Sequence, residues 1–184
     1  MSEYKPFTFV TGSQDKADYL AAHLGLPVEH AAIALDEIQS LNLADVATHK
    51  AKQAYATIQK PVLVEDVSLE FAALGGLPGS FIKFFMQAMS EDALCRLLDG
   101  HDRSATARCV FAYYDGTTVT LFEGFLHGSI AQKPAGDGGF GWDRIFIPDG
   151  HTVTRAELAK DGYTKTYTTI KPFKAVREFL TTAD

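Results

Sequence analysis

The stretch "VLVEDVSLEF" occupies residues 62–71 and places two carboxylates, Glu65 and Asp66, directly after a β-branched apolar run. Residues 61–66 are predicted to form a strand that ends at these two acids. Successive residues of a strand point to opposite faces of its sheet, so the two side chains are predicted to face opposite ways. Because a carboxylate is costly to bury unless it is paired or binds a metal, this pair is the first candidate for a functional site.

The composition is that of a globular protein with a substantial core. The chain has 184 residues, of which 46% are hydrophobic and 22% are charged. This length suits one compact domain or two closely joined lobes. A formal net charge of −6 and a pI of about 5.5 argue against a nucleic-acid-binding surface. The same charge leaves room for a small anionic ligand that is bound by a local group of lysines.

Cysteine usage and hydropathy indicate a cytoplasmic protein without a membrane anchor. The two cysteines, Cys95 and Cys109, form no CxxC pair and no zinc-binding spacing, which is typical of a reducing compartment. The N-terminal residues lack the apolar segment of a signal peptide. No apolar run approaches the roughly eighteen residues that a membrane span needs.

Periodicity and turn residues predict an α/β fold with a mixed sheet and flanking helices. No repeat or linker divides the chain, so a single domain over residues 1–184 is expected. The predicted elements are a strand in 7–13, a helix over 16–24, an extended segment over 25–35, a helix over 43–59, a strand over 61–66, a loop over 75–80, a helix beginning at 81, a helix over 90–98 capped by Ser90, a hairpin with its turn at 115–116, a loop over 133–144 and a helix over 173–180.

The sequence "TGSQDK" (11–16) lies at a predicted strand-to-helix turn. Backbone N–H groups at such a turn, together with the positive end of the helix dipole, favour an anion. Thr11 and Ser13 add hydroxyl groups and Lys16 adds a positive charge. The alternative is an ordinary capped turn with a solvated lysine. The turn is not a P-loop, because the pattern GxxxxGK[ST] is absent.

Two pairs of acids follow two extended segments. Asp36 and Glu37 follow the first, and Glu65 and Asp66 follow the second. Carboxylates from two strand ends that converge can bind Mg²⁺, which takes one or two protein carboxylates with water and substrate phosphates. The alternative is two solvated strand ends, and the more polar surroundings of Asp36 and Glu37 make theirs the weaker pair.

Two lysines on predicted helices, Lys50 and Lys83, are further candidates, with surface solvation as the alternative for each. Lys83 either extends out of an apolar patch or faces a cleft. Its neighbours are all bulky and apolar: Phe81, Ile82, Phe84 and Phe85.

The segment "GGFGWDR" (138–144) has the composition of a ligand-binding loop. Glycines allow the backbone to approach a flat ligand closely. Phe140 or Trp142 can stack on such a ligand, and Asp143 can accept hydrogen bonds. The alternative is an aromatic side chain that fills the core beneath a flexible loop.

Four segments, taken in order, resemble the inosine/xanthosine triphosphate pyrophosphatase family: "FVTGSQDK", "LDEIQS", "PVLVEDVSLEFAALGGLPGSFIKFF" and "GFGWDRIFIPDG". The resemblance runs in register from about residue 7 to residue 158. It implies an elongated α/β fold with two lobes around a central cleft, a homodimer and a requirement for Mg²⁺. It also implies cleavage of deaminated purine nucleoside triphosphates such as ITP, dITP and XTP to monophosphate and pyrophosphate, which removes them from the nucleotide pool.

The resemblance assigns a role to most of the candidate residues. Glu37 and Asp66 match metal ligands, and Asp66 also matches the acid that activates water. Glu65 receives no role from it. Ser13 stands where the family usually has asparagine. The matched phosphate-binding residues are Thr11, Gly12, Ser13, Lys16, Lys50 and Lys83, and the matched base-binding residues are Phe140, Gly141, Trp142 and Asp143.

Two departures from the family pattern bear on base specificity. Arg144 replaces a proline, and the Ser-His-Arg block that reads the purine 6-oxo group is absent from residues 160–176. Spacing does not choose among Lys160, Lys165 and Lys171 as substitutes for the family lysine. Alternatives therefore remain open: a modified pyrimidine nucleotide as substrate, with Arg144 or Tyr167 reshaping the base pocket, or a weakly active nucleotide-binding regulatory paralogue.

Overall fold

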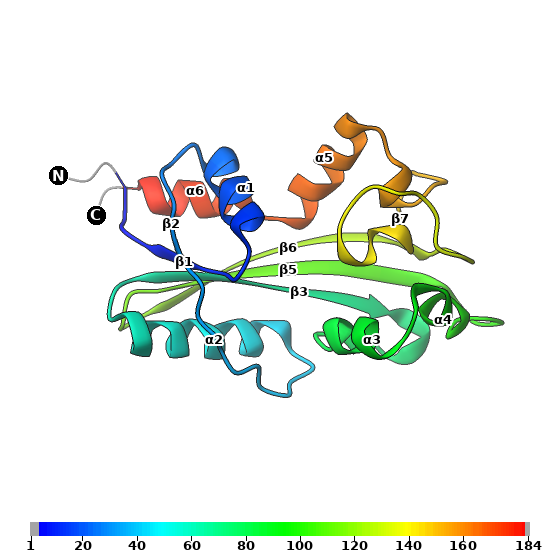
Figure 1. The fold of residues 1–184 in the computed structure, drawn as a ribbon, viewed down its shortest axis with the longest axis horizontal. Helices are drawn as coiled ribbons and strands as arrows, with labels where there is room; N and C mark the ends of the chain where they lie inside the picture. Colours follow the sequence, from blue (N-terminus) through cyan, green and yellow to red (C-terminus); the bar gives the residue numbers. More distant parts are fainter. Residues whose placement is uncertain (1–3, 183–184) are drawn as a thin grey trace. The chain divides into compact units, whose positions relative to one another are not determined.

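The computed structural model describes residues 4–182 and confirms a mixed α/β fold with one seven-stranded sheet (Figure 1). The strand order is β2-β1-β3-β5-β6-β7, and β4 pairs with β3. The chain divides into two compact units. The first unit comprises the residues up to 66, 110–123 and those from 172 on, and the second comprises 67–109 and 124–171.

The first unit is built on three parallel strands. These are β1 (Thr8–Val10), β2 (Glu29–Ala31) and the first half of β3 (Val62–Phe71). In this register Val10 lies beside Ala31 on one side and Val64 on the other. β1 and β2 therefore end beside the middle of β3, close to Glu65 and Asp66, and ligands of open α/β sheets commonly bind at the carboxyl ends of parallel strands.

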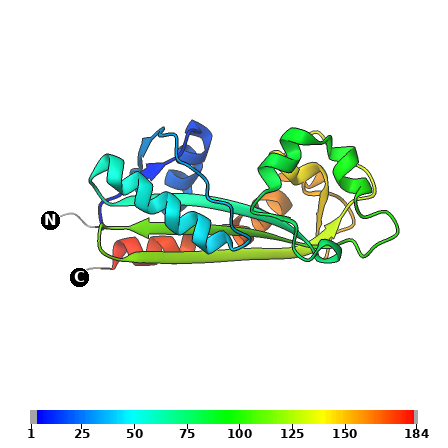
Figure 2. The ribbon, with the colours of Figure 1, turned by 90° about the horizontal axis from the view of Figure 1, so that it is seen from below.

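Helices cover both faces of this part of the sheet (Figures 1 and 2). On one face α1 (Gln14–Leu24) contacts α6 (Phe173–Thr181), and α2 (Leu43–Ile58) lies on the other face. Alternate side chains of each strand point to opposite faces of the sheet. The core beneath α2 consists of Val10, Leu43, Ala47, Ala51, Ala54, Val62, Val64, Val110 and Ala112.

Three predicted helices of the first unit are confirmed, and capping side chains fix the start of two of them. The Ser13 hydroxyl accepts a hydrogen bond from the Lys16 backbone N–H, so α1 begins at Gln14. Asn42 caps α2 by accepting from the N–H of Ala44 at 3.0 Å. The last predicted helix is α6.

The predicted hairpin joins β5 (Ser104–Tyr114) to β6 (Val119–Ile130). Asp115 Oδ1 accepts hydrogen bonds from the backbone N–H groups of Thr117 and Thr118 at 2.8 and 2.7 Å, which fixes the turn. Gly116 has a φ of +99°, and a Cβ at this position would lie 2.3 Å from the hydroxyl oxygen of Tyr55. The turn therefore requires glycine for both its backbone conformation and its packing.

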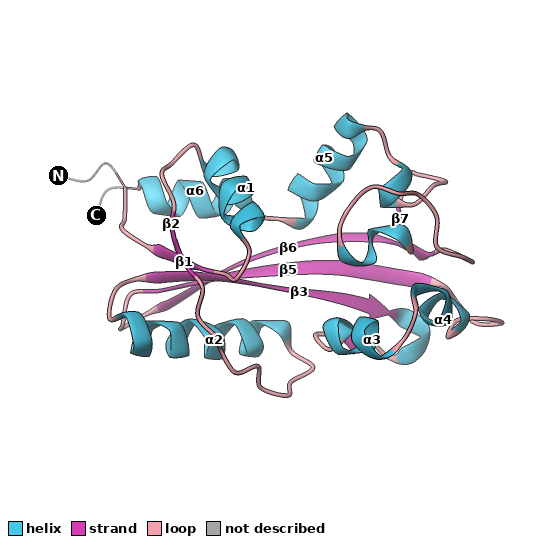
Figure 3. Ribbon diagram, viewed as in Figure 1, coloured by secondary structure: helices cyan, strands magenta, loops and turns pink. Residues whose placement is uncertain are grey.

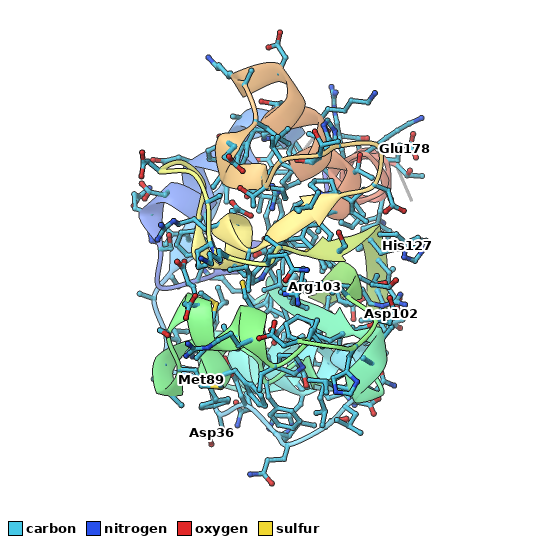
Figure 4. The ribbon with its side chains drawn as sticks, turned by 90° about the vertical axis from the view of Figure 1, so that its right-hand side faces the viewer. Asp36, Met89, Asp102, Arg103, His127 and Glu178 are labelled. Carbon is cyan, nitrogen blue, oxygen red and sulfur yellow. The ribbon has the colours of Figure 1, made fainter. Side chains whose placement is uncertain are left out.

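The second unit combines short helices and strands with the remaining halves of the long strands (Figure 3). Ser90 caps α4 as predicted, since its hydroxyl accepts from the N–H of Ala93. Arg103 points inward beside the outward Asp102 (Figure 4) and donates to the carbonyl oxygens of Cys95, Ile130 and Ala131. The shorter elements are η1 (Ala72–Leu74), β4 (Pro78–Gly79), α3 (Ile82–Ala88), α4 (Glu91–Arg96), η2 (Gly141–Arg144), β7 (Phe146–Pro148), η3 (Arg155–Glu157) and α5 (Lys160–Ile170).

Three expectations about secondary structure were wrong, one of them the loop over 133–144, whose last residues form the 3-10 helix η2 (Gly141–Arg144). The strand expected to end at residue 66 continues to Phe71, because Leu69 and Phe71 are both fully buried. The expected loop 75–80 contains β4, which pairs with β3.

One helix, α5, was not predicted. Gly162 and several threonines give it low intrinsic helix propensity. The hydroxyls of Thr168 and Thr169 both donate to the carbonyl oxygen of Lys165, so these side chains bind their own helix.

Candidate active site

The adjacent acids of β3 point to opposite faces of the sheet, as predicted. Val62 and Val64 pack beneath α2, and alternation places Asp66 on that same face. Glu65 lies on the other face, where α1 begins. Each acid meets a lysine from the helix on its own side.

Lys50 of α2 lies between two carboxylates. Its Nζ is 3.0 Å from Asp66 Oδ2 and 3.5 Å from Glu37 Oε1. The side chains of Lys50, Asp66 and Glu37 are 14%, 15% and 25% exposed, so solvent reaches the group without surrounding it. Lys50 lies three residues after Ala47 and four before Ala54, which places it beside the stripe of α2 that packs on the sheet.

The charges of this group determine the protonation of the lysine. Burial lowers the pKa of Lys50, but the negative charges of Asp66 and Glu37 and their hydrogen bonds outweigh burial, so the pKa is raised above its ordinary value. Lys50 is therefore a cation at every physiological pH.

Lys16 and Glu65 form the corresponding pair on the opposite face. Lys16 Nζ lies 3.2 Å from Glu65 Oε1, and the Glu65 side chain is only 6% exposed. In the adjoining turn, the Thr11 hydroxyl accepts from the N–H of Ser13 at 3.2 Å, and Gly12 is exposed. The turn is thus capped, as the ordinary alternative supposed, and its lysine is paired with an acid.

The carboxylates of Glu37 and Asp66 suit a hard divalent cation. Both already converge on one positive charge, the ammonium of Lys50, so a cation in that place has two oxygen ligands within reach. No cluster of three or more histidine, cysteine or acidic side chains suited to metal binding occurs within residues 4–182. This donor set fits Mg²⁺, which keeps several waters and uses few protein ligands, better than it fits a structural zinc ion.

In the second unit the predicted base-binding residue Asp143 forms a buried ion pair. Its Oδ1 lies 2.5 Å from Arg155 Nη1, and the two side chains are 3% and 4% exposed. Asp143 Oδ2 accepts from the Phe140 backbone N–H at 2.7 Å and from the Tyr163 hydroxyl at 2.8 Å. Burial, followed by the charge of Asp143, raises the pKa of Tyr163.

Arg155 makes several contacts besides its ion pair with Asp143. Its Nε donates to the Thr166 hydroxyl at 3.1 Å, and its guanidinium lies 4.7 Å from the ring centre of Tyr163 and 5.5 Å from that of Trp142. The Nη2 atom is buried, with no hydrogen-bond acceptor among residues 4–182. The two aromatic rings near the guanidinium can stabilise its charge by cation–π interaction.

The two aromatic candidates of the loop 138–144 differ in exposure. Phe140 is 77% exposed and remains accessible to a ligand. Trp142 is buried and packs edge-on against Phe146, as the core-filling alternative supposed. Gly141 has a φ of +62° with open space where a Cβ would lie, and a Cβ on Gly139 would meet Asp143 at 2.6 Å.

The remaining lysine candidates all lie in the second unit and differ in burial. Lys83 is exposed on α3 with its Nζ 6.0 Å from the Phe84 ring centre. Lys160 and Lys165 are exposed on α5, whereas Lys171 is buried with its Nζ 5.4 Å from the Tyr167 ring centre.

Arg144, which departs from the family pattern, forms a hydrogen bond and an ion pair within the second unit. Its Nε donates to the Gly136 carbonyl oxygen at 2.8 Å and its Nη1 lies 2.7 Å from Glu91 Oε2.

Sequence reasoning missed Arg155 and Tyr163. One local signal was available, because Thr154 and Glu157 have the spacing of a capping box and form one here. That signal predicts the helical turn of Arg155 but gives no indication of its partner Asp143.

The structure is of the α/β class with a parallel part of the sheet, in which ligands commonly bind beside the carboxyl ends of the strands. Within this class, the family model described as "Ham1 family" matches residues 7–179, so the chain belongs to the Ham1 family.

Named relatives support this assignment at the level of sequence. The chain is 45% identical over 156 residues to inosine triphosphate pyrophosphatase 2 of Trypanosoma cruzi, covering 82% of this chain and 80% of that protein. It is 44% identical over 135 residues to a dITP/XTP pyrophosphatase of Hyperthermus butylicus, covering 73% and 71%.

Solved structures agree at the level of fold. A HAM1 protein from Coxiella burnetii superimposes with a TM-score of 0.81 at 24% identity, covering 94% of this chain and 98% of that one. A dITP/XTP pyrophosphatase from Mycobacterium abscessus gives 0.77 at 25% identity, covering 93% and 98%. Within the described residues, every helix is too short or too polar to cross a lipid bilayer.

Proposed function

We propose that this protein hydrolyses nucleoside triphosphates to the monophosphate and pyrophosphate, with deaminated purine nucleotides such as ITP, dITP and XTP as substrates. The observation that carries the proposal is the convergence of Glu37 and Asp66 on Lys50. The relatives named as inosine triphosphate and dITP/XTP pyrophosphatases support the reaction and the substrate class. Such an activity removes non-standard nucleotides from the precursor pool.

The proposed cofactor is Mg²⁺, with Glu37 and Asp66 as its protein ligands. When bound, Mg²⁺ would neutralise charge on the phosphate oxygens as the bond to the leaving group breaks.

The chain's own groups have separate roles in the reaction. Asp66 would accept a hydrogen bond from a water molecule and orient it toward the α-phosphorus. As the water oxygen bonds to the α-phosphorus, Asp66 would accept a proton from that water, the bond between the α-phosphorus and its bridging oxygen would break, and pyrophosphate would leave with the bridging oxygen. Lys16, Lys50 and the turn residues Thr11, Gly12 and Ser13 would bind the phosphate oxygens, since positive charge and hydroxyl or N–H donors favour an anion.

The resemblance adds Lys83 to the phosphate-binding residues and assigns the base to residues 140–143. The exposed ring of Phe140 suits stacking on a purine. Asp143 and Trp142 would act by holding this segment in place, since both are buried and bonded within the second unit.

Three further proposals concern the whole chain. We propose that it acts as one functional domain, because the family match runs without a break from residue 7 to residue 179. We propose a homodimer, as the resemblance implies, which light scattering of the purified protein would test. A cytoplasmic location is proposed from the nucleotide substrate and from Cys95 and Cys109, which are both buried and form no CxxC pair.

The test is a pyrophosphate-release assay across ITP, dITP, XTP, the common nucleoside triphosphates and modified pyrimidine triphosphates, with Mg²⁺ or with EDTA. The expected result is Mg²⁺-dependent release that is fastest for the deaminated purines. Nucleotide binding without turnover of any triphosphate would contradict the proposal and would indicate a regulatory nucleotide-binding protein instead.

A further inference from the structure

The ammonium of Lys50 lies where two carboxylates converge. Its Nζ is within 3.5 Å of an oxygen of each, and these are the acids to which we assign the metal. A lysine ammonium and a divalent cation repel each other, so they cannot share these oxygens at such distances. The lysine nitrogen here stands in for the metal ion.

The position of Lys50 limits how it can give way. Its neighbours on α2, Ala47 and Ala51, are fully buried against the sheet, so the backbone of this turn is fixed. The ammonium can therefore move only by rotation about the bonds of the flexible four-carbon side chain. Once displaced from Asp66 and Glu37, a half-buried ammonium needs another anionic acceptor, since leaving it unpaired is costly.

We propose that Lys50 is an internal counter-ion that blocks the metal site until a polyphosphate accepts its ammonium, so that metal and nucleotide bind with positive coupling. This inference rests on the proposed function, because the acceptor is the triphosphate of the substrate. When metal binds alone, it must displace the Lys50 ammonium from the two carboxylates, and no new anion is present to accept that ammonium. Triphosphate provides that partner, and linkage requires each ligand to strengthen the other by the same factor.

The test measures metal binding rather than turnover. Binding of Mn²⁺ alone, followed by electron paramagnetic resonance, is compared for the wild-type protein and Lys50→Met, with and without a non-hydrolysable α,β-methylene analogue of ITP. The wild-type protein is expected to bind Mn²⁺ about tenfold more tightly when the analogue is present. Lys50→Met is expected to bind Mn²⁺ about tenfold more tightly without the analogue, and to lose most of the response to it.

Two variants serve as controls. Lys50→Arg keeps the positive charge and is expected to keep weak binding of Mn²⁺ alone. Lys52→Met removes an exposed lysine from the same helix, two residues away, and is expected to behave as the wild-type protein. If Lys50→Met does not fold, as judged by circular dichroism, Lys50→Gln takes its place with the same expected result.

Unchanged or weaker binding of Mn²⁺ alone to the variant would overturn the inference, because the lysine would then support the site rather than compete for it. This failure is distinct from failure of the proposed function. Release of pyrophosphate by the wild-type protein, combined with unchanged metal affinity in Lys50→Met, would leave the hydrolysis standing and reject the counter-ion. Absence of pyrophosphate release would reject the function whatever the metal titration shows.

Discussion

The two ion pairs at Asp66 and Asp143 use similar chemistry in different surroundings. Lys50 and Asp66 are 14% and 15% exposed, whereas Arg155 and Asp143 are 4% and 3% exposed. Asp143 also binds a backbone N–H and a tyrosine hydroxyl, which leaves it no freedom to exchange partners. Solvent access therefore distinguishes the two pairs, since water reaches Lys50 and Asp66 but is nearly excluded from Arg155 and Asp143.

The largest expected effect comes from breaking the exposed pair. Asp66→Asn keeps the shape of the side chain but removes its charge, and is expected to lower the kcat for pyrophosphate release by about 1,000-fold. The melting temperature should change by only a few degrees, because solvent reaches this group. Asp18→Asn, on the exposed side of α1, is the matched control. An unchanged rate in Asp66→Asn would remove this acid from the mechanism.

Breaking the buried pair is expected to affect stability first. Arg155→Met leaves the Asp143 charge buried without its cation, which should lower the free energy of unfolding by about 3–5 kcal/mol. Urea denaturation followed by circular dichroism measures the change.

The matched control for the buried pair is Arg96→Met, which breaks an exposed helical pair with Asp92 and should cost less than about 1 kcal/mol. Equal losses for the two arginines would show that burial does not distinguish these pairs.

Alkaline pH should lower the stability of the protein through Tyr163, which donates a hydrogen bond to the buried Asp143. The pKa of Tyr163 is raised from 10.0, so its contribution to stability is complete below pH 10 and is lost as pH rises through the folded value. The slope cannot exceed about 1.4 kcal/mol per pH unit for one proton. The raised pKa of Lys50 changes stability in the same direction, and this contribution to stability is lost only above pH 10.5.

Urea denaturation of wild type and Tyr163→Phe between pH 9 and 11 measures the tyrosine's share of this effect. The variant should lose less stability between pH 10 and 11. Identical slopes for the two proteins would contradict the raised pKa.

The smallest expected effect concerns Glu65. Glu65→Gln weakens the hold on Lys16 and should raise the KM for nucleotide by about fivefold, with little change in kcat. Stability should fall by about 1 kcal/mol or less, since the lysine is one-third exposed. Glu29→Gln, on exposed β2, is the control. A large fall in kcat with unchanged KM would place Glu65 in the chemistry itself.

Local sequence rules predicted the first of these two pairs better than the second. Strand alternation predicts that Glu65 and Asp66 face opposite ways, because this relation depends on neighbours in the chain, whereas the convergence of Asp66 and Glu37 was left open against two solvated strand ends. Asp143 and Arg155 meet across a turn with no regular spacing, so no periodic signal marks them. The end of β3 was misplaced for a related reason, since the burial of Ser68 and Leu69 depends on tertiary packing.

The opposed directions of Glu65 and Asp66 also restrict how this chain can change length over evolution. Inserting or deleting one residue within β3 would exchange the two acids between faces, and would separate both lysines from their partners in a single event. The turn at 115–118 carries no such constraint, since it lies between two strands that pair across it. We expect lineages of this protein to vary in length at such turns while the spacing from Val62 to Asp66 stays fixed.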